Sequence, residues 1–123
     1  MSPDLAAALI SVGKVLLASL YVVGGVRHLF ILPVLTEAIR ARGVPAPRLV
    51  LLAATVVEIA AGVALVAGWN PALAAAALIG FTLAASVLML NFWDQTGETR
   101  SNSISAWQAN IALIGGLLIA AAA

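Results

Sequence analysis

Residues 49–90 read LVLLAATVVEIAAGVALVAGWNPALAAAALIGFTLAASVLML. This stretch holds two apolar segments, 49–67 and 71–90, each close to the roughly 20 residues that a helix needs to cross a bilayer. Gly68-Trp69-Asn70-Pro71 separates them. So short a turn predicts an antiparallel hairpin, with Asn70 as the helix cap and Pro71 in the first helical position. Helix is favoured over strand because a helix satisfies its own backbone hydrogen bonds in lipid.

Two further apolar segments, 9–30 and 104–122, flank this hairpin. The sequence therefore predicts an all-α integral membrane four-helix bundle, one transmembrane domain covering residues 1–123. Composition agrees, since 63% of residues are hydrophobic and 9% are charged, against about 25% charged in a soluble domain. We expect a multi-pass protein of the cell membrane, with the lipid bilayer as its main partner.

The segment from Pro33 to Gly43 is too short to cross a membrane. It predicts a short amphipathic helix at the membrane interface, between the first and second spans. The alternative is an ordinary loop helix packed on the bundle. The apolar face is expected to hold Val34, Leu35, Ala38 and Ile39.

Charge distribution suggests an orientation for the four spans. The loops at one end and their flanks carry Arg27, Arg40, Arg42, Arg48 and Arg100, whereas the other end has Lys14 within the first span. The positive-inside rule places the arginines in the cytoplasm and both termini outside. At the arginine-bearing end the polar stretch 94–103 should lie in water or headgroups. Ser105-x-x-Gln108 then predicts a capping box where the last span begins.

Glu58 is the sharpest single feature, because it lies at the middle of the second span. An ionised carboxylate at that depth costs several kcal/mol unless it is paired or hydrated. One interpretation is a proton-binding or substrate-binding site inside the bundle. The other is a carboxyl group hydrogen-bonded to a neighbouring helix that holds the bundle together.

A second group of polar residues gathers where the predicted helices meet at one membrane face. Tyr21 and His28 are seven residues apart and share a helical stripe. We expect an ion pair between Arg27 and Asp94, and a hydrogen bond from His28 to Asn91 or Asn110. The alternative is that arginine and tryptophan simply anchor helix ends. The candidate ligand- or proton-binding residues are Glu58, Arg27, His28, Tyr21, Asn91, Trp93, Asp94 and Asn110.

Several kinds of chemistry are disfavoured by composition. The chain has no cysteine and one histidine, which argues against thiolate chemistry, iron–sulfur ligation and a haem held by two histidines of one chain. No spacing of ligands predicts a metal site. The net charge of +1 provides no basic stripe for nucleic acid. We therefore expect no catalytic residue that acts alone.

Four motifs in order resemble the DoxX family of small four-span membrane proteins. They are Gly13-Lys14-Val15-Leu16-Leu17 through Gly24-Gly25-Val26-Arg27-His28, Glu58-Ile59-Ala60-Ala61-Gly62 through Gly68, Asn91-Phe92-Trp93, and Asn110-Ile111-Ala112-Leu113-Ile114-Gly115-Gly116. The chain departs from the family where members often have histidine and lysine, here Leu90 and Ala109.

This resemblance implies an accessory or anchoring subunit of a quinone- or thiol-linked redox complex, with a redox-enzyme partner and a polar intramembrane site. A quinone is the cofactor that such a site could hold. The alternative is a small proton-coupled transporter that uses Glu58 and works as a homo-oligomer. A third alternative is a purely structural or assembly protein.

Overall fold

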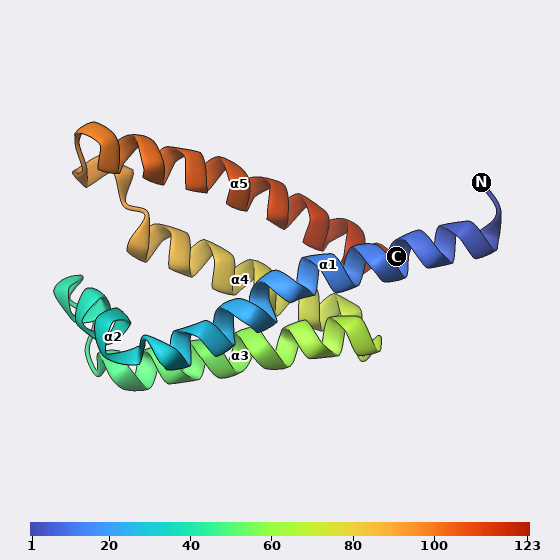
Figure 1. Ribbon diagram of the computed structural model, residues 1–123, viewed down its shortest axis with the longest axis horizontal. Helices are drawn as coiled ribbons and strands as arrows, with labels where there is room; N and C mark the ends of the chain where they lie inside the picture. The colour runs from blue at the N-terminus through green and yellow to red at the C-terminus, as the bar shows by residue number, and fades with distance from the viewer.

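The computed structural model describes residues 1–123 and is built of helices (Figure 1). Four helices are long and apolar enough to cross a membrane, which confirms the predicted all-α membrane bundle. The elements are α1 (Pro3–Phe30), α2 (Leu32–Ala41), α3 (Pro47–Ala67), α4 (Pro71–Met89), the short 3-10 helix η1 (Phe92–Asp94) and α5 (Gly97–Ala122).

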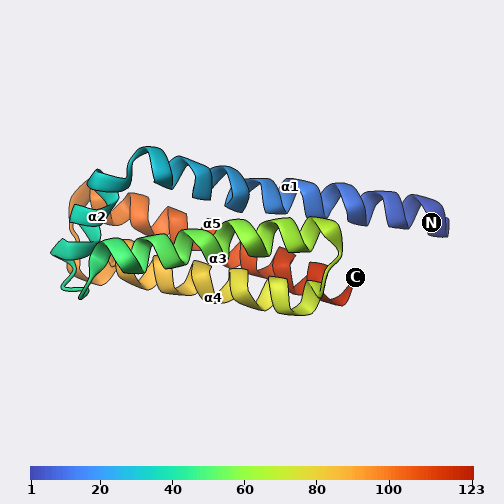
Figure 2. The same cartoon turned by 90° about the horizontal axis from the view of Figure 1, so that it is seen from below.

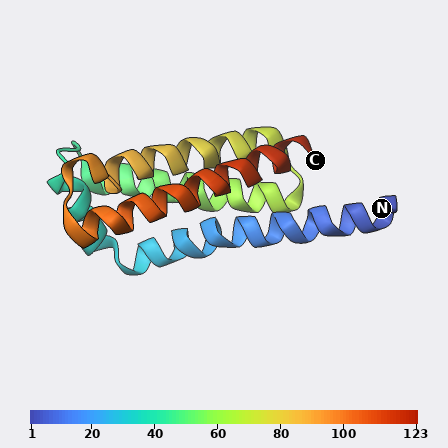
Figure 3. The same cartoon turned by 90° about the horizontal axis from the view of Figure 1, so that it is seen from above.

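The long helices alternate in direction. α3 and α4 form a hairpin, α1 lies along α3, and α5 lies along α4, whereas α1 and α5 touch little (Figures 2 and 3). The short helix α2, η1 and the start of α5 gather at one end of the bundle (Figure 1). The α3–α4 turn and both chain termini lie at the other end, with α1 projecting beyond its neighbours (Figure 2).

The α3–α4 turn forms as the sequence predicts. Asn70 adopts a left-handed backbone with φ 42°, and its side-chain oxygen accepts a hydrogen bond from the Leu73 N–H at 3.4 Å. Pro71 occupies the first turn of α4, and Gly68 ends α3 with φ 75°. Glycine and asparagine tolerate positive φ, so this turn reverses the chain at low cost.

Most of the large apolar side chains point away from the bundle. Only 19 of 123 residues are buried, and Leu16 and Ile119 are 67% and 72% exposed. A soluble monomer does not carry so continuous an apolar surface. The interior combines several alanines with a few leucines and one tyrosine, and such small residues are typical where helices associate in lipid.

Glycines let α1 and α3 approach closely. A Cβ on Gly25 would lie 2.5 Å from Cγ1 of Ile59, and one on Gly62 would lie 2.8 Å from Cγ2 of Val22. Neither position has room for a side chain. The close contact fixes how α1 lies on α3, and therefore which of their polar side chains meet.

The predicted short helix between the first two spans is present as α2, and part of its apolar face packs on the bundle. Ile39 is buried and Leu35 partly buried, but Val34 is 70% exposed. Thr36 is buried instead of Val34. Its hydroxyl donates a hydrogen bond to the Leu32 carbonyl at 2.7 Å, so the buried polar group is satisfied without water.

The predicted capping box at Ser105 is also wrong. α5 begins at Gly97, with Thr96 extended at the cap position, so Ser105 lies inside the helix. Most polar residues before 104 are exposed, so their side chains can reach water while the backbone stays hydrogen-bonded, and the buried Ser103 donates its hydroxyl to Gln95. Glu98 in the first turn also interacts favourably with the positive end of the helix dipole.

Candidate functional site

Glu58 is buried at the middle of α3 with its carboxyl group against α1. The residue is 3% exposed. A Cβ on Gly24 would lie 3.1 Å from Oε1 of Glu58, so the missing side chain of this glycine leaves the space that the carboxyl fills. Oε2 lies 3.1 Å from Nδ1 of His28, which stands in the last turns of α1.

The contact between His28 and Glu58 leaves hydrogen-bonding capacity unused. The two atoms are at ion-pair distance, but no aligned hydrogen bond joins them, and both are buried without another partner. The hydroxyl of Thr55, one turn before Glu58, is also buried without a partner. Buried polar atoms are nearly always hydrogen-bonded, so these three atoms keep the capacity to bond a further polar group.

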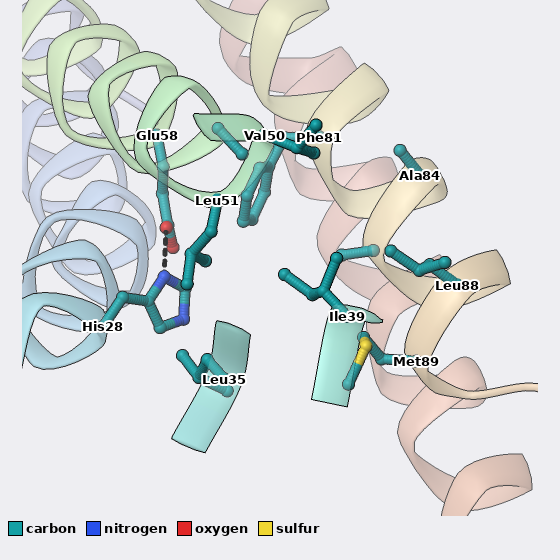
Figure 4. A pocket seen from close by; sticks show the side chains of 12 residues that line it. His28, Leu35, Ile39, Val50, Leu51, Glu58, Phe81, Ala84, Leu88 and Met89 are labelled. Atoms are coloured by element: carbon teal, nitrogen blue, oxygen red, sulfur yellow. Dashed lines mark ion pairs between the residues drawn. The ribbon is translucent and has the colours of Figure 1, made fainter. Parts of the chain in front are cut away.

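A cavity of about 320 Å³ adjoins the pair. His28 and Glu58 lie on one side of it, and Ile39, Leu88 and Met89 lie across from them (Figure 4). The remaining walls are apolar side chains of α2, α3 and α4. They belong to Leu35, Val50, Leu51, Ala54, Phe81, Ala84 and Ala85. The site therefore suits a molecule with a largely apolar body and a small polar group.

Helix α2 covers one end of this cavity with Leu35 and Ile39. It is held there by Arg42, which follows the helix and donates a hydrogen bond from Nε to the Leu88 carbonyl of α4 at 2.6 Å. The α2 segment thus forms part of the site. Its apolar side chains were visible in the sequence, but nothing in the spacing indicated what they would cover.

Tyr21 and Asn110, two predicted site residues, belong to a separate network. The Tyr21 hydroxyl lies 2.8 Å from Oγ1 of Thr82, and Asn110 donates to Oγ of Ser86 at 2.9 Å. Thr82 and Ser86 donate their own hydroxyl protons to carbonyls of α4. Tyr21 is therefore the donor to Thr82, and the network joins α1, α4 and α5 with no hydroxyl left free to bind a ligand.

The predicted ion pair between Arg27 and Asp94 is wrong, as is the predicted bond from His28 to Asn91 or Asn110. Arg27 and Asp94 are exposed and unpaired, and His28 turns to Glu58 instead. The reason is that α4 ends at Met89 and η1 carries the following residues toward the start of α5.

The residues around η1 fasten the α4–α5 connection. The Asn91 side-chain oxygen accepts a hydrogen bond from the Gln95 amide at 3.3 Å. The Gln95 side-chain oxygen accepts one from the Ser103 hydroxyl at 2.5 Å. The Trp107 indole donates to the Leu90 carbonyl at 2.7 Å. Trp93 is half-exposed and packs its ring edge-on to Phe92. Of the eight predicted residues, the structure thus brings together only Glu58 and His28 at the cavity.

The sequence of this chain is similar to known membrane proteins. A family model described as DoxX matches residues 9–91. The inner membrane protein YphA of Escherichia coli (strain K12) is 32% identical over 80 residues, which cover 64% of this chain. The matched region spans about half of that relative, 56% of its length. No solved structure matches.

Proposed function

The chain belongs to the DoxX family of integral membrane proteins, and from this premise we propose that it is an accessory subunit that holds a quinone for a membrane redox complex. The observation that carries the proposal is the unsatisfied His28–Glu58 pair at the side of an apolar cavity. A quinone has carbonyl oxygens that can accept hydrogen bonds, a flat ring and an apolar tail. These features match a site with few polar groups and many apolar walls.

The residues present fit such a ligand in a simple way. A ring N–H of His28 can donate to a quinone oxygen, and Glu58 can hydrogen-bond a hydroxyl of the reduced form. Phe81, Leu51 and Met89 provide apolar contact for the ring and the first part of the tail. The quinone would supply the redox chemistry, and this chain would bind and orient it.

An accessory role follows from what the chain itself contains. Without cysteine, and with one histidine, it does not supply the usual side-chain ligands of an electron-carrying centre. A partner enzyme would provide that centre. Purification from native membranes is expected to bring down a redox enzyme with its own cofactor, and loss of this enzyme on mild washing would argue against a complex.

Proton-coupled transport is the alternative use of the same carboxyl. It requires a polar path from Glu58 toward the other membrane face. In that direction the interior holds the hydroxyls of Tyr21 and Thr82, which are hydrogen-bonded to each other, and is otherwise filled by small and apolar side chains. They include Ala18, Ala61, Leu65, Ala74, Ala75, Leu78, Leu117 and Ala120. The packing therefore favours a site approached from the α2 end over a pathway through the bundle.

Binding of decylubiquinone and of its reduced form, decylubiquinol, to the purified protein in nanodiscs tests the proposal. His28→Leu is expected to weaken decylubiquinone binding, and Glu58→Leu decylubiquinol binding, each about fivefold, because each removes one hydrogen bond worth roughly 1 kcal/mol. Lys14→Gln, on α1 but away from the cavity, is the control and should bind like the unaltered protein. Unchanged binding in both site variants would overturn the proposal. Proton-driven uptake that Glu58→Gln abolishes, without any quinone binding, would favour the transporter.

A further inference from the structure

A second groove lies outside the quinone site, between the end of α2 and the beginning of α3. It is a shallow, open hollow of about 430 Å³ and is lined by Arg40 and Arg48 together with Ala46, Pro47, Leu49 and Leu52. The two arginines come from different helices and face one hollow. The other lining side chains are apolar, so the groove has a basic rim and an apolar floor.

The two guanidinium groups are available to a ligand. Arg48 is exposed and makes no ion pair or side-chain hydrogen bond. Arg40 pairs with Glu37 one turn earlier on α2, where both side chains are well exposed. Exposed pairs of this kind contribute little free energy, so a phosphate that contacts both arginines can displace the glutamate. Arg42 is already committed to the Leu88 carbonyl and does not enter the groove.

The position of the groove sets what can reach it. It lies where α3 starts, at the end of the bundle that carries α2 and most of the arginines (Figure 1). This is the level at which a membrane-spanning helix passes from headgroups into acyl chains. Leu49 is 68% exposed beside Arg48, so apolar surface continues from the charged rim toward the lipid.

We propose that this groove binds an anionic phospholipid, whose phosphate contacts Arg40 and Arg48 and whose acyl chain lies over Leu49 and Leu52. Charge complementarity selects an anionic headgroup, and the apolar floor selects a lipid over a free phosphate ion. Basic pockets beside membrane helices bind such headgroups, and arginine suits phosphate because of its planar set of donors. The bound lipid would bridge α2 to α3 and so steady the segment that covers the quinone site.

Native mass spectrometry of the protein released from nanodiscs tests this, with dioleoylphosphatidylglycerol and dioleoylphosphatidylcholine as the two lipids. The unaltered protein should retain the phosphatidylglycerol preferentially. Arg48→Gln is expected to lower this retention about fivefold, which corresponds to about 1 kcal/mol per basic residue near an anionic surface. Arg100→Gln is the matched control, because Arg100 lies at the same end but over the Phe92 ring.

A variant of opposite expected sign guards against simple loss of folding. Glu37→Gln frees Arg40 from its partner and should increase retention of phosphatidylglycerol. Equal retention of the two lipids by the unaltered protein would overturn the proposal. So would an Arg100→Gln loss as large as that of Arg48→Gln, which would indicate general surface charge. Displacement of the lipid by millimolar inorganic phosphate would also overturn it, by showing a site for the free ion.

Discussion

Gly25 and Ile59 lie so close that the glycine has no room for a Cβ, which would stand 2.5 Å from Cγ1 of the isoleucine. The neighbouring pair, Gly24 and Glu58, is almost as close. These two contacts decide how far the carboxyl of Glu58 lies from the end of α1. The geometry of the polar site is thus set by residues that have no side chains.

Gly25→Ala is expected to destabilise the protein by about 1–3 kcal/mol, because the added methyl group forces α1 and α3 apart or displaces Ile59. Unfolding in mixed micelles measures the change. Gly115→Ala is the control, since a Cβ there meets nothing within 4 Å and alanine is the better helix former. A Gly25→Ala protein as stable as Gly115→Ala would show that the contact is easily relieved.

Gly24→Ala should act on the site more than on stability. Its Cβ would meet the end of the Glu58 side chain, at 3.1 Å from Oε1, and this side chain can move. Such a movement changes the distance to His28 and should weaken decylubiquinol binding severalfold while the unfolding transition stays nearly unchanged. Equilibrium binding and unfolding, measured on the same sample, check the effect on the site and the effect on stability. Full retention of binding would mean that the carboxyl position does not matter.

The bundle could be predicted from sequence because its signals are local. Segment length and apolarity identified four spans, and Asn70-Pro71 identified the tight turn. The placement of Glu58 inside the bundle followed from the cost of exposing a carboxyl to lipid. Each of these inferences needs only the residues of one segment and the properties of the membrane.

The partners of Glu58 could not be predicted in the same way. The sequence predicts that His28, Asn91 and Asn110 lie at one end of the bundle, but it does not determine which of these side chains are in contact. That choice depends on the rotation of α1 against α3, which is fixed by Gly25 and Gly62, and on the point where α4 stops. Thr55 could have been predicted as a buried polar neighbour of Glu58, because it lies three residues before Glu58 and so shares its helical face.

Tyr21→Phe is expected to cost about 0.6 kcal/mol in stability, the average measured for hydrogen bonds between membrane helices. It removes the bond from Tyr21 to Thr82 and leaves the ring packed edge-on to Phe81. Decylubiquinone binding should not change, because this network is separate from the cavity. A double-mutant cycle with Thr82→Val measures the coupling. A large loss of quinone binding in Tyr21→Phe would show that Tyr21 takes part in the binding site after all.

Arg42→Gln is expected to loosen α2 without unfolding the bundle. The hydrogen bond from Arg42 to the Leu88 carbonyl ties the end of this short helix to α4, and a helix of ten residues is marginal without tertiary contacts. Hydrogen exchange of the α2 amides should become faster while that of α3 stays slow, since local opening has its own free energy. Arg100→Gln is the control, because Arg100 lies at the same end of the bundle but on α5, over the Phe92 ring. Equal exchange in Arg42→Gln and the unaltered protein would show that Leu35 and Ile39 alone hold α2 over the cavity.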